Sequence, residues 1–277
     1  MMSQEAPFAS LDELVARIGP GAMVAIPPEY CGVAMAATRA LVRRGAEQLH
    51  LVGCPSSGLQ ADILIGAGCV ATVEAAAITF GEFGPAPRFT RAVRDGSIAI
   101  KDSTCPAIHA GLQATEKGVP FMPLRGIIGS DLVTHRPEWK VIDNPLANNG
   151  DDPIVVLPAI APDIALFHAA LADRHGNVWV GRRRELISMA HAARETLVTV
   201  EAEYDGDLLA DERMAAGTLP GLYVSAIAIE PRGAWPLAFA EHYDLDNDHM
   251  AEYVRLAASD DGFARYTASH IHSAAAA

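Results

Sequence analysis

The chain is poor in aromatic residues and in positive charge. Phe, Trp and Tyr make up 6% of its 277 residues, so its core must rest on Ala, Val, Leu and Ile. Lysine and arginine number 21 against 34 aspartates and glutamates, which gives a formal net charge of -13. This imbalance argues against nucleic acid and against an anionic membrane as partners. It leaves an anionic cofactor open, because backbone amides can bind an anion without basic side chains.

Cysteine and long apolar runs are also scarce. The four cysteines show no C-x-x-C spacing, which argues against a disulfide framework and favours a reduced, cytoplasmic setting. We expect no membrane span, because no stretch of about 18 apolar residues is free of charges or Gly/Pro breaks. The first residues lack the basic start and apolar run of a signal peptide.

Patterns of metal ligands are absent as well. The ten histidines are scattered, and none falls in an H-E-x-x-H motif. The stretch "DLDND" (244–248) imitates the start of an EF-hand loop, but His249 and Arg255 stand where Gly and Glu belong. We therefore expect no metal site. The basic cluster "GRRRE" (181–185) is typical of a solvated face, with binding of a phosphate or of a partner protein as the alternative.

Short apolar runs alternate with helical patterns along most of the chain. Strands are expected at 22–26, 48–53 and 97–102, for example, and helices at 33–45 and 107–118. This alternation predicts an α/β fold with an open, mostly parallel sheet flanked by helices. We expect one domain over 1–277, in which the part after about residue 150 could form a smaller lobe. The Gly-, Pro- and Asn-rich stretch 120–152 reads as irregular, and such stretches are usually functional.

A turn rich in hydroxyl groups, "GCPSSG" (53–58), follows the second of these strands. It is neither a G-x-S-x-G nucleophile elbow nor a phosphate loop with a G-K-[ST] lysine. It does place Ser56, Ser57 and Gly58 at a strand's carboxyl end, where ligands bind in open α/β sheets. We therefore predict that these three residues bind substrate. The plainer alternative is that a serine only caps the next helix.

Three further charged residues at expected turns are candidates for a catalytic or binding role. Glu82 in "FGEFGPAPR" could act as a nucleophile or general base, or it could be an ordinary exposed loop acid. Asp102 in "KDST" ends an expected strand and is either a functional carboxylate or a helix cap. Arg125 in "PLRGIIGSDL", followed by Ser130, suits bidentate binding of a carboxylate or phosphate. The alternative for Arg125 is a packing or surface role.

In their order along the chain, these motifs resemble the α subunit of class I CoA-transferases, and most of all the α-subunit branch of the glutaconate CoA-transferases. The resemblance runs from about residue 20 to 245, and "APDIALFHAALADRHGN" is its most specific segment. The other matching stretches include "VGCPSSGLQADILIGAG", "GEFGPAPRF", "GLQATEKGVPFMPLRGIIGSDL" and "YVSAIAIEPRGAWP".

The resemblance implies a partner, a substrate and a mechanism. In this family an α and a β subunit of similar fold assemble, commonly as α2β2, with the active site between them. A β-subunit glutamate attacks the acyl-CoA, an acyl anhydride and then a glutamyl-CoA thioester form, and CoA passes to a carboxylic acid, which divides one difficult exchange into easier steps. Coenzyme A is thus expected as part of the substrate, without a metal. The loops of the α subunit would hold the acyl group.

This chain departs from the family pattern at three places. It lacks the S-E-N-G motif of the β subunit, and Glu82-Phe83-Gly84 repeats only the short form E-x-G. Asp102 occupies the position at which a ring-opening acyl-CoA hydrolase branch uses an α-subunit glutamate. "PPEYCG" (27–32) replaces a glycine-rich G-G-F motif, which puts Glu29 at a strand end facing the expected pocket. Three hypotheses follow: the α subunit of a transferase, the α subunit of a ring-opening hydrolase of steroid catabolism, and a non-catalytic binding subunit.

Overall fold

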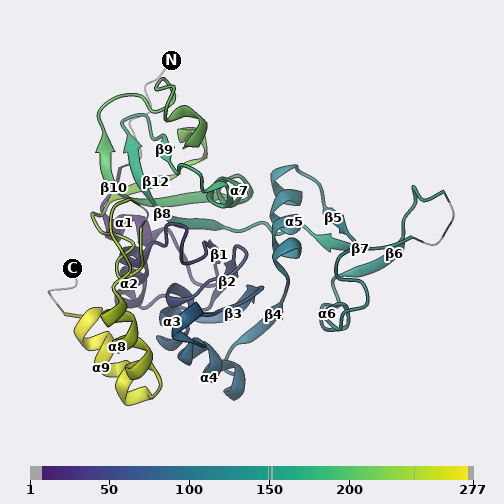
Figure 1. Ribbon diagram of the computed structural model, residues 1–277, viewed down its shortest axis with the longest axis horizontal. Helices are drawn as coiled ribbons and strands as arrows, with labels where there is room; N and C mark the ends of the chain where they lie inside the picture. The colour runs from purple at the N-terminus through teal and green to yellow at the C-terminus, as the bar shows by residue number, and fades with distance from the viewer. Residues whose placement is uncertain (1–7, 149, 151, 240, 274–277) are drawn as a thin grey trace.

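The computed structural model describes residues 8–148, 150, 152–239 and 241–273, and a nine-stranded sheet forms its centre (Figure 1). Seven parallel strands follow one another in the order β12 (Ala226–Ile229), β10 (Glu195–Tyr204), β8 (Ile164–Asp173), β1 (Met23–Ile26), β2 (Leu49–Gly53), β3 (Val70–Ala75) and β4 (Ala99–Asp102). Alongside the C-terminal end of β8, the sheet gains two short antiparallel strands, β9 (Val178–Trp179) and β11 (Thr218–Leu219). The predicted open, mostly parallel α/β fold is confirmed.

The chain builds this sheet outward from β1 in two directions. β2, β3 and β4 are added on one side in chain order, and β8, β10 and β12 are then added on the other side. The strand order therefore reverses between β1 and β8. In open α/β sheets, ligands bind outside the carboxyl ends of the strands at such a reversal.

Helices cover both faces of the sheet. One face carries the larger hydrophobic cluster and the helices α1 (Leu11–Ala16), α2 (Met35–Arg44), α3 (Leu59–Gly66), α4 (Pro87–Asp95), α8 (Asn247–Ala257) and α9 (Asp260–His270). The other face carries a second cluster under α5 (Cys105–Glu116) and α7 (Arg184–Ala192). Within the described residues, three short 3-10 helices lie in the connections: η1 (Gly81–Phe83), η2 (Ala215–Gly217) and η3 (Gly221–Tyr223).

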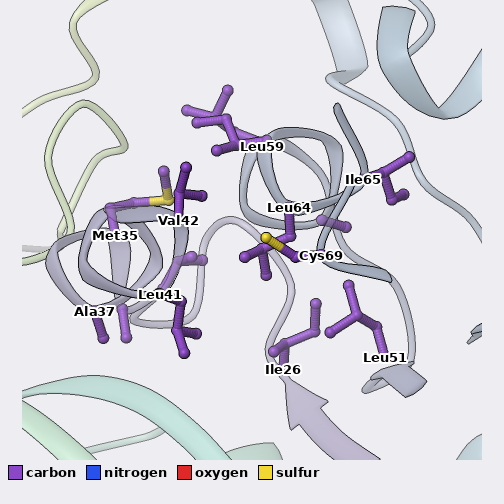
Figure 2. Packing of buried hydrophobic residues seen from close by; sticks show 14 of the residues in the cluster. Ile26, Met35, Ala37, Leu41, Val42, Leu51, Leu59, Leu64, Ile65 and Cys69 are labelled. Carbon is purple, nitrogen blue, oxygen red and sulfur yellow. The ribbon is translucent and has the colours of Figure 1, made fainter. Parts of the chain in front are cut away.

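Aliphatic side chains dominate the larger cluster, as the low aromatic content predicts. Figure 2 shows Leu41 of α2 and Leu64 of α3 with Ile26 and Leu51 of the sheet nearby. All four side chains are at most 1% exposed. Burying each one fully stabilises the fold by about 1.5–3 kcal/mol relative to leaving it exposed.

A second, three-stranded antiparallel sheet projects beyond α5 (Figure 1). Its strands are β5 (Phe121–Leu124), β7 (Pro153–Pro158) and β6 (Lys140–Asp143), with the short helix α6 (Leu132–His135) between β5 and β6. The stretch 120–152 is thus less irregular than expected: its strands are four residues long and largely exposed, so they lack an apolar signature. Whether a separate lobe begins after about residue 150 stays a prediction.

Arg136 joins this small sheet to the edge of the large one. Its guanidinium donates to Glu74 Oε1 on β3 (2.6 Å), to the carbonyl of Asp102 on β4 (2.7 Å) and to Glu138 Oε1 (2.9 Å). It also lies over the ring of Trp139, 4.4 Å from the centroid. Arg136 and Glu74 are nearly completely buried. One side chain therefore connects two strands of the large sheet to the base of the small one.

Two sequence expectations concern the cell compartment. Cys31, Cys54, Cys69 and Cys105 are free cysteines, and the first three are buried. Within the described ranges, no helix is long and apolar enough to cross a lipid bilayer. The cytoplasmic setting stays a prediction.

Candidate functional site

A cavity of about 480 Å³ opens where the strand order reverses between β1 and β8. Its walls come from the loop after β1, from the middle of β8, and from β9 with the residues that lead into α7. Phe239, Glu241 and His242 complete the lining. The cavity thus occupies the position at which open α/β sheets bind ligands.

The loop after β1 is fastened directly onto β8. The amide of His168 donates to the carbonyl of Gly32 (2.7 Å). Gly32 has a φ of +73°, and a Cβ on it would overlap the carbonyl oxygen of His168. Only glycine fits this close approach. The bond between His168 and Gly32 holds the two preceding residues, Tyr30 and Cys31, in the cavity wall.

A buried polar network forms the floor of the cavity around His168. The ring contacts Thr199 Oγ1 through Nδ1 and Glu201 Oε1 through Nε2, both at 2.8 Å. Glu201 also accepts from the hydroxyl of Tyr243 and from the amide of Arg232, both at 2.7 Å. Thr199 and His168 are fully buried. Both ring nitrogens of His168 and both carboxylate oxygens of Glu201 therefore have partners, as buried polar groups require.

The protonation states in this network follow from its partners. Burial would raise the pKa of Glu201, but hydrogen bonds from His168, the Arg232 amide and Tyr243 lower it to about 2. Burial lowers the pKa of His168, and the neighbouring Glu201 carboxylate only partly opposes this. A neutral His168 that donates from Nε2 to ionised Glu201 and accepts at Nδ1 from Thr199 satisfies both ring nitrogens. His168 therefore has a structural role in the cavity floor. It is not available as a general base, because both ring nitrogens are already hydrogen-bonded.

The cavity wall combines two arginines with aromatic rings. Arg182 and Arg183 lie between β9 and α7, and the Arg183 guanidinium stacks 5.6 Å from the centroid of Tyr30. Among the described residues, neither arginine forms an ion pair with a carboxylate within 4.0 Å. Trp179 and Phe239 supply apolar surface. Such a wall suits a small organic anion with an apolar body.

Cys31 is the thiol of this cavity, and its environment keeps it protonated. Burial raises the pKa of the Cys31 thiol well above its ordinary value, and the nearby carboxylate of Glu185 raises it further. The thiolate is the reactive form of cysteine. Cys31 is consequently a wall residue and not a nucleophile at neutral pH.

Two of the predicted substrate-binding residues meet at the start of α3. Glu29 Oε1 accepts from the amide of Leu59 (2.5 Å), and a Cβ on Gly58 would overlap that oxygen. Burial raises the pKa of Glu29 to about 7, the bond from Leu59 opposes this, and the charge of Asp62 adds to it. The Glu29 carboxylate thus occupies the first backbone amide of α3, beside Gly58.

Replacing Glu29 with glutamine should stabilise the protein at pH 8. The folded-state pKa lies above the usual value of 4.5, so folding becomes less favourable as pH rises from about 4.5 to about 7. Glutamine lacks this ionisation and still accepts from Leu59. We expect Glu29→Gln to raise the free energy of unfolding by about 1 kcal/mol at pH 8 and to have no such effect at pH 4.5. Urea unfolding at both pH values measures this, and equal effects at the two would contradict it.

Ser56 and Ser57 lie in the turn after β2. The Ser57 amide donates to the carbonyl of Ala77, and its own carbonyl accepts from the amide of Thr79. Its hydroxyl is buried and forms no hydrogen bond with the described residues. Gly58 holds the cap position of α3, so the structure does not support a serine cap there. The role of both serines in substrate binding stays a prediction.

Glu82 is exposed in the turn after β3, and Asp102 is exposed as the last residue of β4. Glu82 lies in η1. Asp102 Oδ1 accepts from the amide of Ser103 (2.9 Å), and Thr104, not Asp102, caps α5. Because β2, β3 and β4 are parallel neighbours, these turns share the carboxyl edge of the sheet with the Ser56 turn.

Arg125 and Ser130 belong to the segment between β5 and β6. Arg125 forms an exposed, bidentate ion pair with Asp152, and the hydroxyl of Ser130 donates to the carbonyl of Ile127. In the described part of the chain, the lining of the 480 Å³ cavity includes none of the eight predicted site residues. The structure adds His168, Glu201 and the Arg182–Arg183 pair. The "GRRRE" cluster was the available sequence signal for the last of these.

The family model described as "Coenzyme A transferase" matches residues 8–230. One subunit of the 3-oxoadipate CoA-transferase of Pseudomonas knackmussii is 31% identical, over 96% of this chain and 94% of that protein. The cholesterol ring-cleaving hydrolase IpdA subunit of Rhodococcus jostii is 26% identical, over 98% and 94%. An uncharacterized protein of Archaeoglobus fulgidus is 29% identical over 84% of this chain, which spans about half (51%) of that protein's length.

Solved structures show the same fold. Glutaconate CoA-transferase of Acidaminococcus fermentans superposes with a TM-score of 0.87 at 24% identity, covering 96% of this chain and 89% of that one. The C56S variant of the decarboxylase AibA/AibB superposes with a TM-score of 0.80 at 29% identity, covering 96% and 99%.

Proposed function

Because this chain belongs to the coenzyme A transferase family, we propose that it is the α subunit of an acyl-CoA transferase. The enzyme would move CoA between an acyl-CoA and a carboxylic acid. A β partner of similar fold would supply the nucleophilic glutamate and carry CoA as a glutamyl thioester. We propose an α2β2 assembly in the cytoplasm, with the active site between the subunits and without a catalytic metal.

One observation carries the proposal: a ligand-sized cavity lies at the strand-order reversal, and its two arginines contact no carboxylate in the described part of the chain. The loop that replaces the family's glycine-rich motif supplies Tyr30 and Cys31 to its wall. In this division of labour, the α chain binds and orients the acyl group. The exposed turns at Ser56, Glu82 and Asp102 would then face the partner along the same edge of the sheet.

The arginine pair favours an acyl group that bears a second carboxylate. Two neighbouring guanidinium groups are suited to bind one carboxylate in a wall that also carries aromatic and aliphatic side chains and one acidic residue, Glu241. The names of two similar proteins, for 3-oxoadipate and glutaconate, also denote dicarboxylates. We therefore propose a short dicarboxylic acid as the acyl donor or acceptor.

Alanine at Arg182 and Arg183 should weaken use of dicarboxylates selectively. In the complex with its β partner, we expect the double variant to raise KM for a dicarboxylate by about tenfold or more, since bonds to charged groups contribute about 1.5–3 kcal/mol each. KM for the monocarboxylate of equal length should stay unchanged. Arg184→Ala is the matched control, because Arg184 does not line the cavity. Equal losses for both acids would contradict the assignment.

The same assay separates the other candidate functions. The exposed carboxylate of Asp102 and the similarity to a subunit of a ring-cleaving hydrolase favour hydrolysis as the second candidate. Asp102→Ala should leave CoA transfer intact in a transferase, whereas loss of acyl-CoA cleavage in an assembled complex would favour the hydrolase. A complex that binds acyl-CoA but neither transfers nor hydrolyses it would favour a non-catalytic binding role.

A further inference from the structure

The C-terminal helices bring together three side chains that the sequence keeps apart. α8 and α9 form a helical hairpin, seen at the yellow end of the chain in Figure 1. His249 and Glu252 lie three residues apart on α8, a spacing that puts both on one face of the helix. His270 is the last residue of α9. One ligand atom from each of the three residues lies within 4.8 Å of the others.

These positions are fixed by packing on both sides. His249 is 6% exposed, and its Nε2 contacts the hydroxyl of Tyr266 on α9 at 2.8 Å. His270 is held because the next residue, Ile271, is fully buried and its carbonyl accepts from Arg43. The ring of His270 packs edge-on against that of His249, with centroids 4.8 Å apart. The cluster is therefore built into the fold and not a product of the chain end.

The donor set fits a borderline divalent ion. Two imidazoles and one carboxylate are typical ligands of Zn²⁺ and of neighbouring first-row ions. A tetrahedral ion with bonds of about 2.0–2.1 Å spaces its ligands about 3.3 Å apart. Glu252 Oε2 and His270 Nε2 already lie 3.4 Å apart. The ligand atom of His249 lies within 4.8 Å of both, so its ring has to move closer to reach the same spacing.

We propose that His249, Glu252 and His270 bind one divalent ion of the zinc class that clamps α8 to α9. The partly exposed side chains of Glu252 and His270 give the ion a path from solvent and leave a coordination position for water. The hairpin is already attached to the main body, since Tyr253 of α8 donates to Asp62 of α3 (2.7 Å). A clamp here would therefore stabilise the C-terminal end of the domain. None of the three residues lines the 480 Å³ cavity.

Zinc binding by the full chain tests the proposal. After treatment with chelator and desalting, equilibrium dialysis against Zn²⁺ alone should give one ion per chain, and Zn²⁺ should raise the melting temperature. Glu252→Gln and His270→Ala should each weaken binding by about tenfold or more, as loss of even an outer-shell partner costs about 10–100-fold. Co²⁺ in the same site should show the visible absorption of a tetrahedral ion.

A neighbouring histidine supplies the control. His272 is exposed and lies two residues beyond the cluster, so His272→Ala should bind zinc like the unmodified chain. Both test variants should fold, because the Glu252–His270 pair is partly exposed and contributes little by itself. Equal melting temperatures in chelator will verify this. Unchanged zinc binding in the double variant Glu252→Gln/His270→Ala, or equal weakening by His272→Ala, would overturn the proposal.

Discussion

Replacing Arg136 with methionine should lower the free energy of unfolding by about 3–5 kcal/mol, because it leaves the Glu74 carboxylate buried without its main partner. The side chain of Glu74 is 4% exposed and lies 2.6 Å from the guanidinium. Burial tends to raise the pKa of Glu74, but the nearby His50 ring, the hydrogen bond from Arg136 and the charges of Arg136 and Lys101 together hold it below its usual value. Urea denaturation at pH 7 measures the change.

Two further variants serve as controls for Arg136→Met. Arg17 and Glu195 form an exposed pair at 2.7 Å, with side chains 45% and 38% exposed, so Arg17→Met should cost about 0–1 kcal/mol. Removing both partners, in Arg136→Met/Glu74→Met, should recover part of the loss, since no unpaired charge then remains buried. A cost for Arg136→Met as small as that for Arg17→Met would show that the small sheet is held in another way.

Replacing Glu201 with glutamine should destabilise the protein by about 2 kcal/mol at pH 7, because three hydrogen bonds then lose a charged acceptor. The folded-state pKa of Glu201 is about 2, below the usual value of 4.5. In acid the unfolded chain therefore takes up a proton first, and the stability that Glu201 contributes is lost as pH falls from about 4.5 towards 2. The difference between Glu201→Gln and the unmodified protein should shrink over that range.

His168 adds to acid sensitivity in the same direction. Its folded-state pKa lies below the usual value of 6.5, so the unfolded chain is protonated first as pH falls below that value. Unfolding curves at several pH values from about 7 down to about 2 resolve both contributions. Glu195→Gln, at the exposed surface pair, is the control and should show little change at any pH. An equal loss for Glu201→Gln at both ends of this range would contradict the ionised network.

The sheet could be predicted from the sequence because its strands and helices alternate with clear periodicity. The same alternation placed the turns after β2, β3 and β4 at one edge, since parallel strands share their carboxyl ends. β5 and β6 were not predicted as strands. Each is four residues long and presents exposed side chains, so neither carries the apolar alternation on which such a prediction depends.

The cavity could not be predicted, because it depends on the pairing register of the strands and on the direction in which loop side chains point. His168 sits in the apolar run "ALFHAALAD", and nothing in that run reveals that Thr199 of β10 lies opposite it. The run "GRRRE" is typical of a solvated surface. Which of its arginines face the cavity depends on where α7 begins, and the sequence does not reveal that. Glu29 lies three residues after the end of β1, and its bond to Leu59 depends on how α3 approaches that loop.

The cavity stands over the shortest parallel ladder of the large sheet. β1 and β8 share the register pairs Val24–Ile164 and Ala25–Ala165, whereas β1 and β2 share four pairs and β8 and β10 share nine. Few main-chain bonds of the sheet therefore join its two halves along this seam. The bond from the His168 amide to the Gly32 carbonyl adds one more link across this seam, so the loop that forms the cavity wall also helps to hold the two halves of the sheet together.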